Sequence, residues 1–237
     1  EKYHPYGYMY YTGHSIGQFY GLIAEGLYQK EDFDAQGNLL SGVPVSTYET
    51  KLQPGDVKYK DLNGDGKIDD YDHCYQQKTA LPEIYYGFSL GLNYKNWGLK
   101  ANFQGVARCS VWNTLASVYR PLYGNDKSIS RYYLENCWTE VTPNAHYPRL
   151  TTLSNNHNYQ NSNLWMEKGD YLKLRVLELS YSFPTRFSEK MRLSNCKLFL
   201  KGMNLFSIDH IDIMDPEQIN ADYPSSRSYL IGINVLF

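Results

Sequence analysis

The sequence has no run of about 18 consecutive apolar residues, the length that a membrane-spanning helix requires. Cysteine is scarce as well: Cys74, Cys109, Cys137 and Cys196 lie far apart and form no Cys-x-x-Cys pair. This spacing excludes the common zinc-binding and dithiol redox motifs. A bridge between Cys109 and Cys137 and a set of unpaired thiols are both compatible with it.

Strong charge of one sign is also missing, because 23 Lys and Arg residues nearly balance 25 Asp and Glu residues. A nucleic-acid partner is therefore not expected. The six His residues are scattered, with no His-Glu-x-x-His motif, and no P-loop or dinucleotide fingerprint occurs. Glu135 and Glu140 would suit a glycosidase pair, but nothing selects them from the other acids. We predict that the chain is not an enzyme.

Tyrosine is the abundant residue, with 24 Tyr, 9 Phe and 4 Trp among 237 residues. Tyr-rich strands with modest charge are typical of outer-membrane β-barrels, which carry aromatic girdles at both interfaces. They also occur in sugar-binding β-sandwiches. Composition alone leaves both classes open.

Several segments alternate with a period of two, which predicts β-strands with two unlike faces. One face of 84–94 carries Ile84, Tyr86, Phe88, Leu90, Leu92 and Tyr94, and the other carries Tyr85, Gly87, Ser89, Gly91 and Asn93. After a turn at Lys95 and Asn96, a second strand places Trp97, Leu99, Ala101 and Phe103 on one face. Segment 228–237 repeats the pattern with Tyr229, Ile231, Ile233, Val235 and Phe237. Bulky apolar groups opposite small and polar ones favour lipid-facing strands with a wet interior.

Two further strands are predicted at 170–183 and 196–206. In the first, the apolar face changes side near Val176 and Leu177. We interpret this as a β-bulge, or as a strand whose upper part leaves the membrane and packs on a partner. The irregular segment 107–164 is too long for a connection in a compact domain, which favours a functional loop. The chain is expected to be essentially all β.

A twelve-residue loop at 61–72 has the spacing of a calcium loop. Its ligands would be Asp61, Asn63, Asp65, Lys67 (through its carbonyl), Asp69 and Asp72, with Gly66 at the sharp bend. Asp72 stands where a longer Glu is usual, and we expect His73 beside the loop to be solvated. An Asx- and Gly-rich turn without metal is the alternative. No helix pair flanks the loop, so a structural Ca²⁺ site is predicted rather than a sensor.

Eight stretches, taken in order, resemble one protein family. They are IGQFYGLIAEGLY (16–28), PGDVKYKDLNGDGKID (54–69), YGFSLGLNY (86–94), NFQG (102–105), YPRL (147–150), GDYLKLR (169–175), GMNLF (202–206) and YLIGINV (229–235). Together they resemble the C-terminal third of SusC/RagA-family TonB-dependent outer-membrane transporters of Bacteroidota. The run from Leu172 to Val176 departs from the family's usual SYLRLKN, and the cysteines fit no family pattern.

The resemblance implies that residues 1–237 are C-terminal strands of a large antiparallel transmembrane β-barrel of about 22 strands. It implies long extracellular loops, among them 53–74 with the calcium motif and 107–164, and a terminal strand at 228–237. The implied partners are the rest of the barrel and its plug, TonB acting through the plug, a SusD-like lipoprotein and outer-membrane lipid. The implied function is import of oligosaccharides or peptides.

The first residues are Tyr-rich and form no apolar signal-peptide core, so we expect a mature chain, a trimmed chain or a piece of a longer one. Six or seven strands cannot close such a barrel, and open edges are not tolerated in lipid. We therefore expect a fragment, or one half of a nicked transporter.

Five loop residues are predicted to contact cargo by stacking or hydrogen bonding: Trp112, Tyr119, Tyr123, Asn125 and Trp138. For any one of them, packing within the loop is the simpler role. The alternative function for the whole chain is a secreted, calcium-stabilised β-sandwich that binds glycans. In that case the bulky faces of the strands would be buried between two sheets.

Overall fold

The computed structural model describes all residues except 1–2, 50, 116, 123–127, 219–222 and 224. The chain divides into two compact units. Unit 1 comprises Glu1–Leu81 and Ser110–Glu167, and unit 2 comprises Pro82–Cys109 and Lys168–Phe237. Each unit is built from two stretches of the sequence, so the chain leaves unit 1, enters unit 2 and returns before it ends in unit 2.

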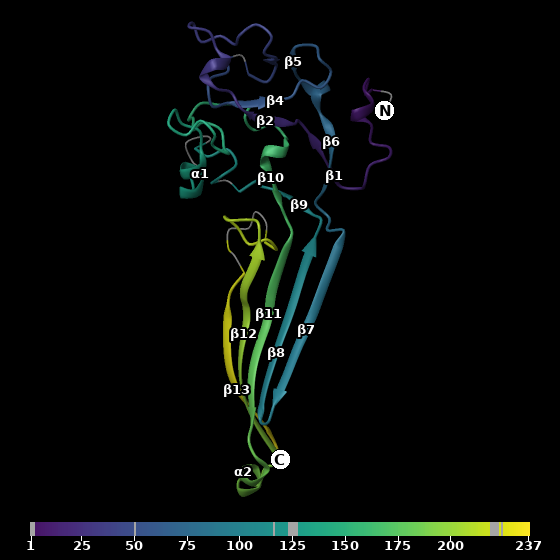
Figure 1. Ribbon diagram of the computed structural model, residues 1–237, viewed down its shortest axis with the longest axis vertical. Helices are drawn as coiled ribbons and strands as arrows, with labels where there is room; N and C mark the ends of the chain where they lie inside the picture. The colour runs from purple at the N-terminus through teal and green to yellow at the C-terminus, as the bar shows by residue number, and fades with distance from the viewer. Residues whose placement is uncertain (1–2, 50, 116, 123–127, 219–222, 224) are drawn as a thin grey trace. The chain divides into compact units, whose positions relative to one another are not determined.

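Unit 2 is one antiparallel sheet of five long strands, which Figure 1 shows side by side. Its spatial order is β13-β12-β11-β8-β7. The strands are β7 (Ile84–Tyr94), β8 (Trp97–Ala107), β11 (Tyr171–Ser182), β12 (Asn195–Asp209) and β13 (Ser228–Leu236), and helix α2 (Thr185–Lys190) joins β11 to β12. The hairpin turn between β7 and β8 is at Lys95 and Asn96, where Lys95 has a φ of 52°. The predicted hairpin is confirmed.

The register places the bulky apolar residues of neighbouring strands on one side, here called the apolar face. Phe88 lies opposite Phe103 with stacked rings 4.7 Å apart, and Trp97 lies opposite Tyr181 at 4.9 Å. The apolar face comprises Ile84, Tyr86, Phe88, Leu90, Leu92, Tyr94, Trp97, Leu99, Ala101, Phe103, Leu177, Leu179, Tyr181, Leu198, Leu200, Tyr229, Ile231, Ile233 and Val235.

Much of the apolar face is open: Leu92 is 67% exposed and Ile231 77%. Among the described residues no second sheet packs against it. The sandwich alternative required these side chains to be buried between two sheets, and it is wrong for this reason. An open face of this size is what a lipid-facing wall requires.

The opposite side, here called the polar face, carries residues that suit contact with water. Glu178 lies across from Lys100 on one neighbouring strand and Lys201 on the other, and the Lys197 ammonium is 3.3 Å from its carboxylate. The polar face comprises Ser89, Lys100, Asn102, Gln104, Glu178, Ser180, Lys197, Lys201 and Asn234. Phe199 is an apolar member of this side, with its ring over Gly232.

A bulge interrupts β11 between Leu174 and Val176, where the register shifts against both β8 and β12. Arg175 is the additional residue relative to β8. The predicted bulge near Val176 is confirmed, because one inserted residue moves every following side chain to the other side of the sheet.

Unit 1 contains short strands in two-stranded pairs instead of one large sheet. The pairs are β1 (Gln18–Gly21) with β6 (Cys74–Thr79), β2 (Ala24–Leu27) with β4 (Val57–Tyr59), and β3 (Val45–Ser46) with β5 (Lys67–Ile68); β9 (Ser110–Trp112) pairs with β10 (Met166–Lys168). Helix α1 (Arg131–Asn136) and the 3₁₀ turns η1 (Gly7–Met9), η2 (Lys30–Asp32), η3 (Asp70–Asp72) and η5 (Asn163–Trp165) complete it. The six-residue α1 was not predicted.

The core of unit 1 is unusually aromatic. One buried cluster consists of Leu22, Leu27, Val57, Tyr59 and Ile68. A second gathers rings from the 107–164 segment and η5: Tyr147 stacks on Tyr133 at 5.0 Å and on Trp165 at 5.8 Å. Many of the tyrosines therefore serve as core. Within the described residues, no helix is both long and apolar enough to cross a membrane.

Candidate functional site

The PGD motif at 54–56 holds unit 1 together around a buried carboxylate. Asp56 is fully buried, and its Oδ1 accepts hydrogen bonds from Arg149 Nε at 2.7 Å and from Asn158 Nδ2 at 2.9 Å. Its Oδ2 accepts from the Gln53 backbone at 2.8 Å. A charge buried this deeply requires such partners. Two of the stretches that carry the resemblance, 54–69 and 147–150, therefore meet at one ion pair.

Gly55 precedes this carboxylate in a conformation that requires glycine. Its φ is +88°, and a Cβ atom there would lie 2.5 Å from the Trp138 ring. Trp138 also donates from Nε1 to the Gln29 side chain at 3.4 Å. The indole thus covers the backbone of the motif.

The Asp-rich loop is organised by hydrogen bonds from its own backbone. Asp61 accepts from Gly64 and Gly66 at 2.6 and 2.8 Å, and Asp65 accepts from Lys67 at 2.8 Å. The buried Asp72 accepts from Leu62 at 2.7 Å and Asp69 at 2.9 Å, which closes the loop. Burial raises the pKa of Asp72, and these backbone donors oppose the rise.

The donor chemistry of this loop suits a hard cation, because the side chains offer carboxylate and amide oxygens. In the part of the chain that the structure describes, however, no three His, Cys, Asp or Glu side chains are grouped so as to hold a metal ion. Both oxygens of Asp72 accept backbone hydrogen bonds instead. Calcium binding by Asp61, Asn63, Asp65, Lys67, Asp69 and Asp72 stays a prediction.

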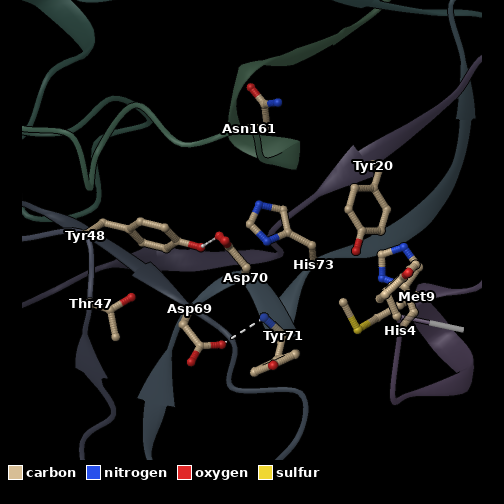
Figure 2. A pocket seen from close by; sticks show the side chains of 11 residues that line it. His4, Met9, Tyr20, Thr47, Tyr48, Asp69, Asp70, Tyr71, His73 and Asn161 are labelled. Carbon is tan, nitrogen blue, oxygen red and sulfur yellow. Dashed lines mark hydrogen bonds between the residues drawn. The ribbon is translucent and has the colours of Figure 1, made fainter. Parts of the chain in front are cut away.

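A cavity of about 810 Å³ lies beside the end of this loop in unit 1 (Figure 2). The Tyr48 hydroxyl donates to Asp70 Oδ1 at 2.8 Å, and the Tyr20 and His73 rings stack 5.5 Å apart. Asp69, which accepts from the Tyr71 backbone, belongs to both the loop and the cavity wall. His73 is partly buried and lines the cavity, so it is less solvated than expected.

The residues predicted to contact cargo do not form one group. Trp112 packs against Phe19 with centroids 5.4 Å apart, and Tyr119 donates its hydroxyl to the Tyr159 carbonyl at 2.7 Å while its ring contacts Trp165. Trp138 lies on Gly55, as described above. Tyr123 and Asn125 lie outside the described residues.

A charged cluster lies in unit 2, beside the bulge. Lys173 is only 3% exposed, and its ammonium is 2.5 Å from Asp215 and 3.0 Å from Glu217. Arg175 also pairs with Glu217. Burial raises the pKa of Asp215, but hydrogen bonds from Lys173, the Glu217 backbone and Ser225, with the charge of Lys173, together outweigh burial and lower the pKa to about 2. The cluster ties the connection between β12 and β13 to β11.

No protein-family model matches the chain. It is 26% identical over 242 residues to TonB-dependent receptor P3 of Formosa agariphila, and 27% identical over 243 residues to TonB-dependent receptor P26 of the same organism. Each alignment covers 95% of this chain but only 22% and 23% of the respective relative. The chain thus spans less than a quarter of these receptors.

Solved structures give the same fold. The RagAB peptide transporter aligns with a TM-score of 0.62 and 22% identity over 92% of this chain, and the RagAB peptide importer in an open-open state aligns with 0.63 and 20% over 93%. Each match covers 22% of the solved chain. Over nearly its whole length the chain is thus similar to part of these TonB-dependent receptors, and it shares the fold of part of the RagAB chains. Its five-stranded sheet is a section of an outer-membrane β-barrel, which these five strands do not close.

The sequence analysis did not predict this cavity. Tyr20, Tyr48, Asp70 and His73 come from segments that no local spacing links, although Tyr20 belongs to the IGQFYG stretch. The relatives are named as receptors, in line with the prediction that the chain is not an enzyme.

Proposed function

We propose that this chain supplies part of the barrel wall and outer loops of a TonB-dependent importer of oligosaccharides or peptides. The observation that carries the proposal is the two-faced sheet, whose apolar side is exposed while its other side carries Lys100, Glu178 and Lys201. A wall with lipid on one side and an aqueous passage on the other requires this division.

In this proposal, unit 1 and the connection at 210–227 form extracellular structure that includes the loops at 53–74 and 107–164. Terminal strand 228–237 pairs with the first strand of the barrel. A plug occupies the barrel, TonB acts through the plug, and a SusD-like lipoprotein closes the outer side. The names of the structural neighbours, a peptide transporter and a peptide importer, support a solute of this size.

The cargo contacts are proposed at Trp112, Tyr119, Tyr123, Asn125 and Trp138. The rings of Trp112, Tyr119 and Trp138 already contact other residues, so cargo would contact the parts of these rings that remain open. The calcium loop is proposed to stiffen this extracellular structure.

Deleting the gene for the complete receptor tests the proposal. Cells should lose uptake of a fluorescent peptide or oligosaccharide, and the complete receptor should restore it. Uptake should also stop in a strain without TonB. Uptake that continues without the receptor, or without TonB, would contradict the proposal.

A further inference from the structure

The cavity in Figure 2 has the dimensions of a ligand site. Its volume of about 810 Å³ falls within the usual range for pockets that hold small organic groups. Its wall combines Met9 of η1, Tyr20 of β1, Tyr48 after β3 and Asp70 of η3. Side chains from four distant segments therefore converge on one space within unit 1.

The charge on this wall has one sign. Asp69 and Asp70 line the cavity, and none of the described residues lining it is Lys or Arg. A positively charged group entering the cavity would meet the Asp70 carboxylate, which is not among the proposed calcium ligands, and no Lys or Arg among the described lining residues would compete with it.

The aromatic rings are held in place before any ligand arrives. Tyr20 stacks on His73 at 5.5 Å, and the rings of Tyr48 and His73 lie edge to face at 6.5 Å. The Tyr48 hydroxyl also fixes the exposed Asp70 carboxylate at 2.8 Å. The face of a tyrosine ring attracts ammonium and guanidinium groups, and a rigid site loses little entropy on binding.

From these three observations we propose that the cavity binds a basic side chain, the ammonium of lysine or the guanidinium of arginine, of a peptide cargo. The inference rests on the proposed import function and adds a cargo class to it. A neutral sugar would use the rings but would bring no positive charge to the exposed Asp70 carboxylate. An amino sugar shares the ammonium chemistry, and the test separates it from a peptide.

The test uses the complete receptor, purified in detergent at constant Ca²⁺, and isothermal titration. The probes are a short lysine-containing peptide with blocked ends, the same peptide with acetyl-lysine, and a chitosan oligosaccharide. We expect the lysine peptide to bind and the acetylated peptide to bind at least about tenfold more weakly, because a charge-assisted contact is lost.

Asp70→Asn should weaken binding of the lysine peptide about tenfold, while Glu25→Gln, the same loss of charge at an exposed position of unit 1, should leave it unchanged. Tyr48→Phe, which keeps the ring but frees Asp70, should weaken binding by a smaller factor. Circular dichroism and thermal unfolding confirm that each variant is folded.

Equal binding of the lysine and acetyl-lysine peptides, or no effect of Asp70→Asn, overturns the proposal. Binding of chitosan but not of the lysine peptide overturns the peptide assignment. If the receptor takes up cargo in a TonB-dependent way but does not bind the lysine peptide in these titrations, only the cavity proposal is contradicted. If the receptor binds the lysine peptide but supports no TonB-dependent uptake, the proposed import function is contradicted instead.

Discussion

Arg149 donates from Nε to Oδ1 of the fully buried Asp56 across 2.7 Å, although 93 residues separate the two in the sequence. Removing the cation leaves a buried carboxylate with neutral donors only. Arg149→Met should therefore destabilise unit 1 by about 3–5 kcal/mol. Hydrogen exchange at amides 53–59 in the complete receptor measures the loss.

The control for this change is Arg131→Met, which removes an exposed arginine paired with Glu135 one helical turn away. Such a pair contributes at most about 0.5 kcal/mol. Equal protection in the Arg149 variant and the wild type would show that the buried pair is not the anchor described here.

Gly55→Ala separates steric conflict from backbone strain. The new methyl group would meet the Trp138 ring at 2.5 Å and would also force alanine to a φ of +88°. Gly37→Ala has a similar φ of +81° but open space around its Cβ. We expect about 1–2 kcal/mol for Gly37→Ala and about 1–3 kcal/mol more for Gly55→Ala. Thermal unfolding measures both losses of stability. If the two variants lose similar amounts, the Trp138 ring moves away from the new methyl group at little cost.

His157 predicts a pH dependence of stability. Its Nδ1 lies 2.7 Å from the Ser46 hydroxyl and its Nε2 lies 2.6 Å from the Val57 carbonyl, so the neutral ring satisfies both. Burial lowers its pKa, opposed by the bond to Val57. Above pH of about 6.5, folded and unfolded chains are both neutral at this residue and its contribution is complete.

As the pH falls below that value, the unfolded chain takes up the proton first and stability decreases. The slope approaches about 1.4 kcal/mol per pH unit until the folded ring also titrates. Hydrogen exchange at amides 55–59 across pH should show this slope in the wild type and a shallower one in His157→Gln. The control His146→Gln changes an exposed histidine and should keep the wild-type slope of stability against pH. If His157→Gln also keeps that slope, the pH dependence comes from other groups.

The two faces of β7 predict opposite responses to the same new charge. Leu90→Lys places an ammonium on the apolar face, at a cost of about 2–4 kcal/mol near the middle of a bilayer. Ser89→Lys places it on the polar face and should cost little. Heat-modifiable migration of the receptor in gels reports the folded fraction. Equal folding of both variants would contradict the lipid assignment.

Calcium is tested directly. If the Asp-rich loop binds Ca²⁺, titration of the metal-free receptor gives a heat of binding, and Asp65→Asn weakens it by at least about tenfold. Asp34→Asn removes the same charge from a turn outside the loop and should change nothing. A wild-type receptor without measurable binding would leave the loop as an Asx- and Gly-rich turn.

The strands of unit 2 could be predicted because lipid and water impose a strict period of two, and the 84–94 strand was located to the residue. The phase change near Val176 gave the bulge for the same reason. Unit 1 has no such period. Its core includes tyrosines such as Tyr133 and Tyr147, a residue type that is equally common on surfaces. The Asp56–Arg149 pair and the cavity depend on contacts between distant segments, which no local spacing reveals.

The inserted residue in β11 decides which medium each half of that strand meets. Before the bulge, the odd-numbered residues Tyr171 and Lys173 lie on the polar face. After it, the even-numbered residues Glu178 and Ser180 lie on that face. In a regular strand of the same sequence, with Arg175 paired like its neighbours, Lys173 would share a side with Leu177 and Leu179, and its ammonium would face hydrocarbon. The one residue without a partner on β8 thus lets Lys173 and Glu178, five positions apart, face the same medium, and so it sets the dielectric around a charge.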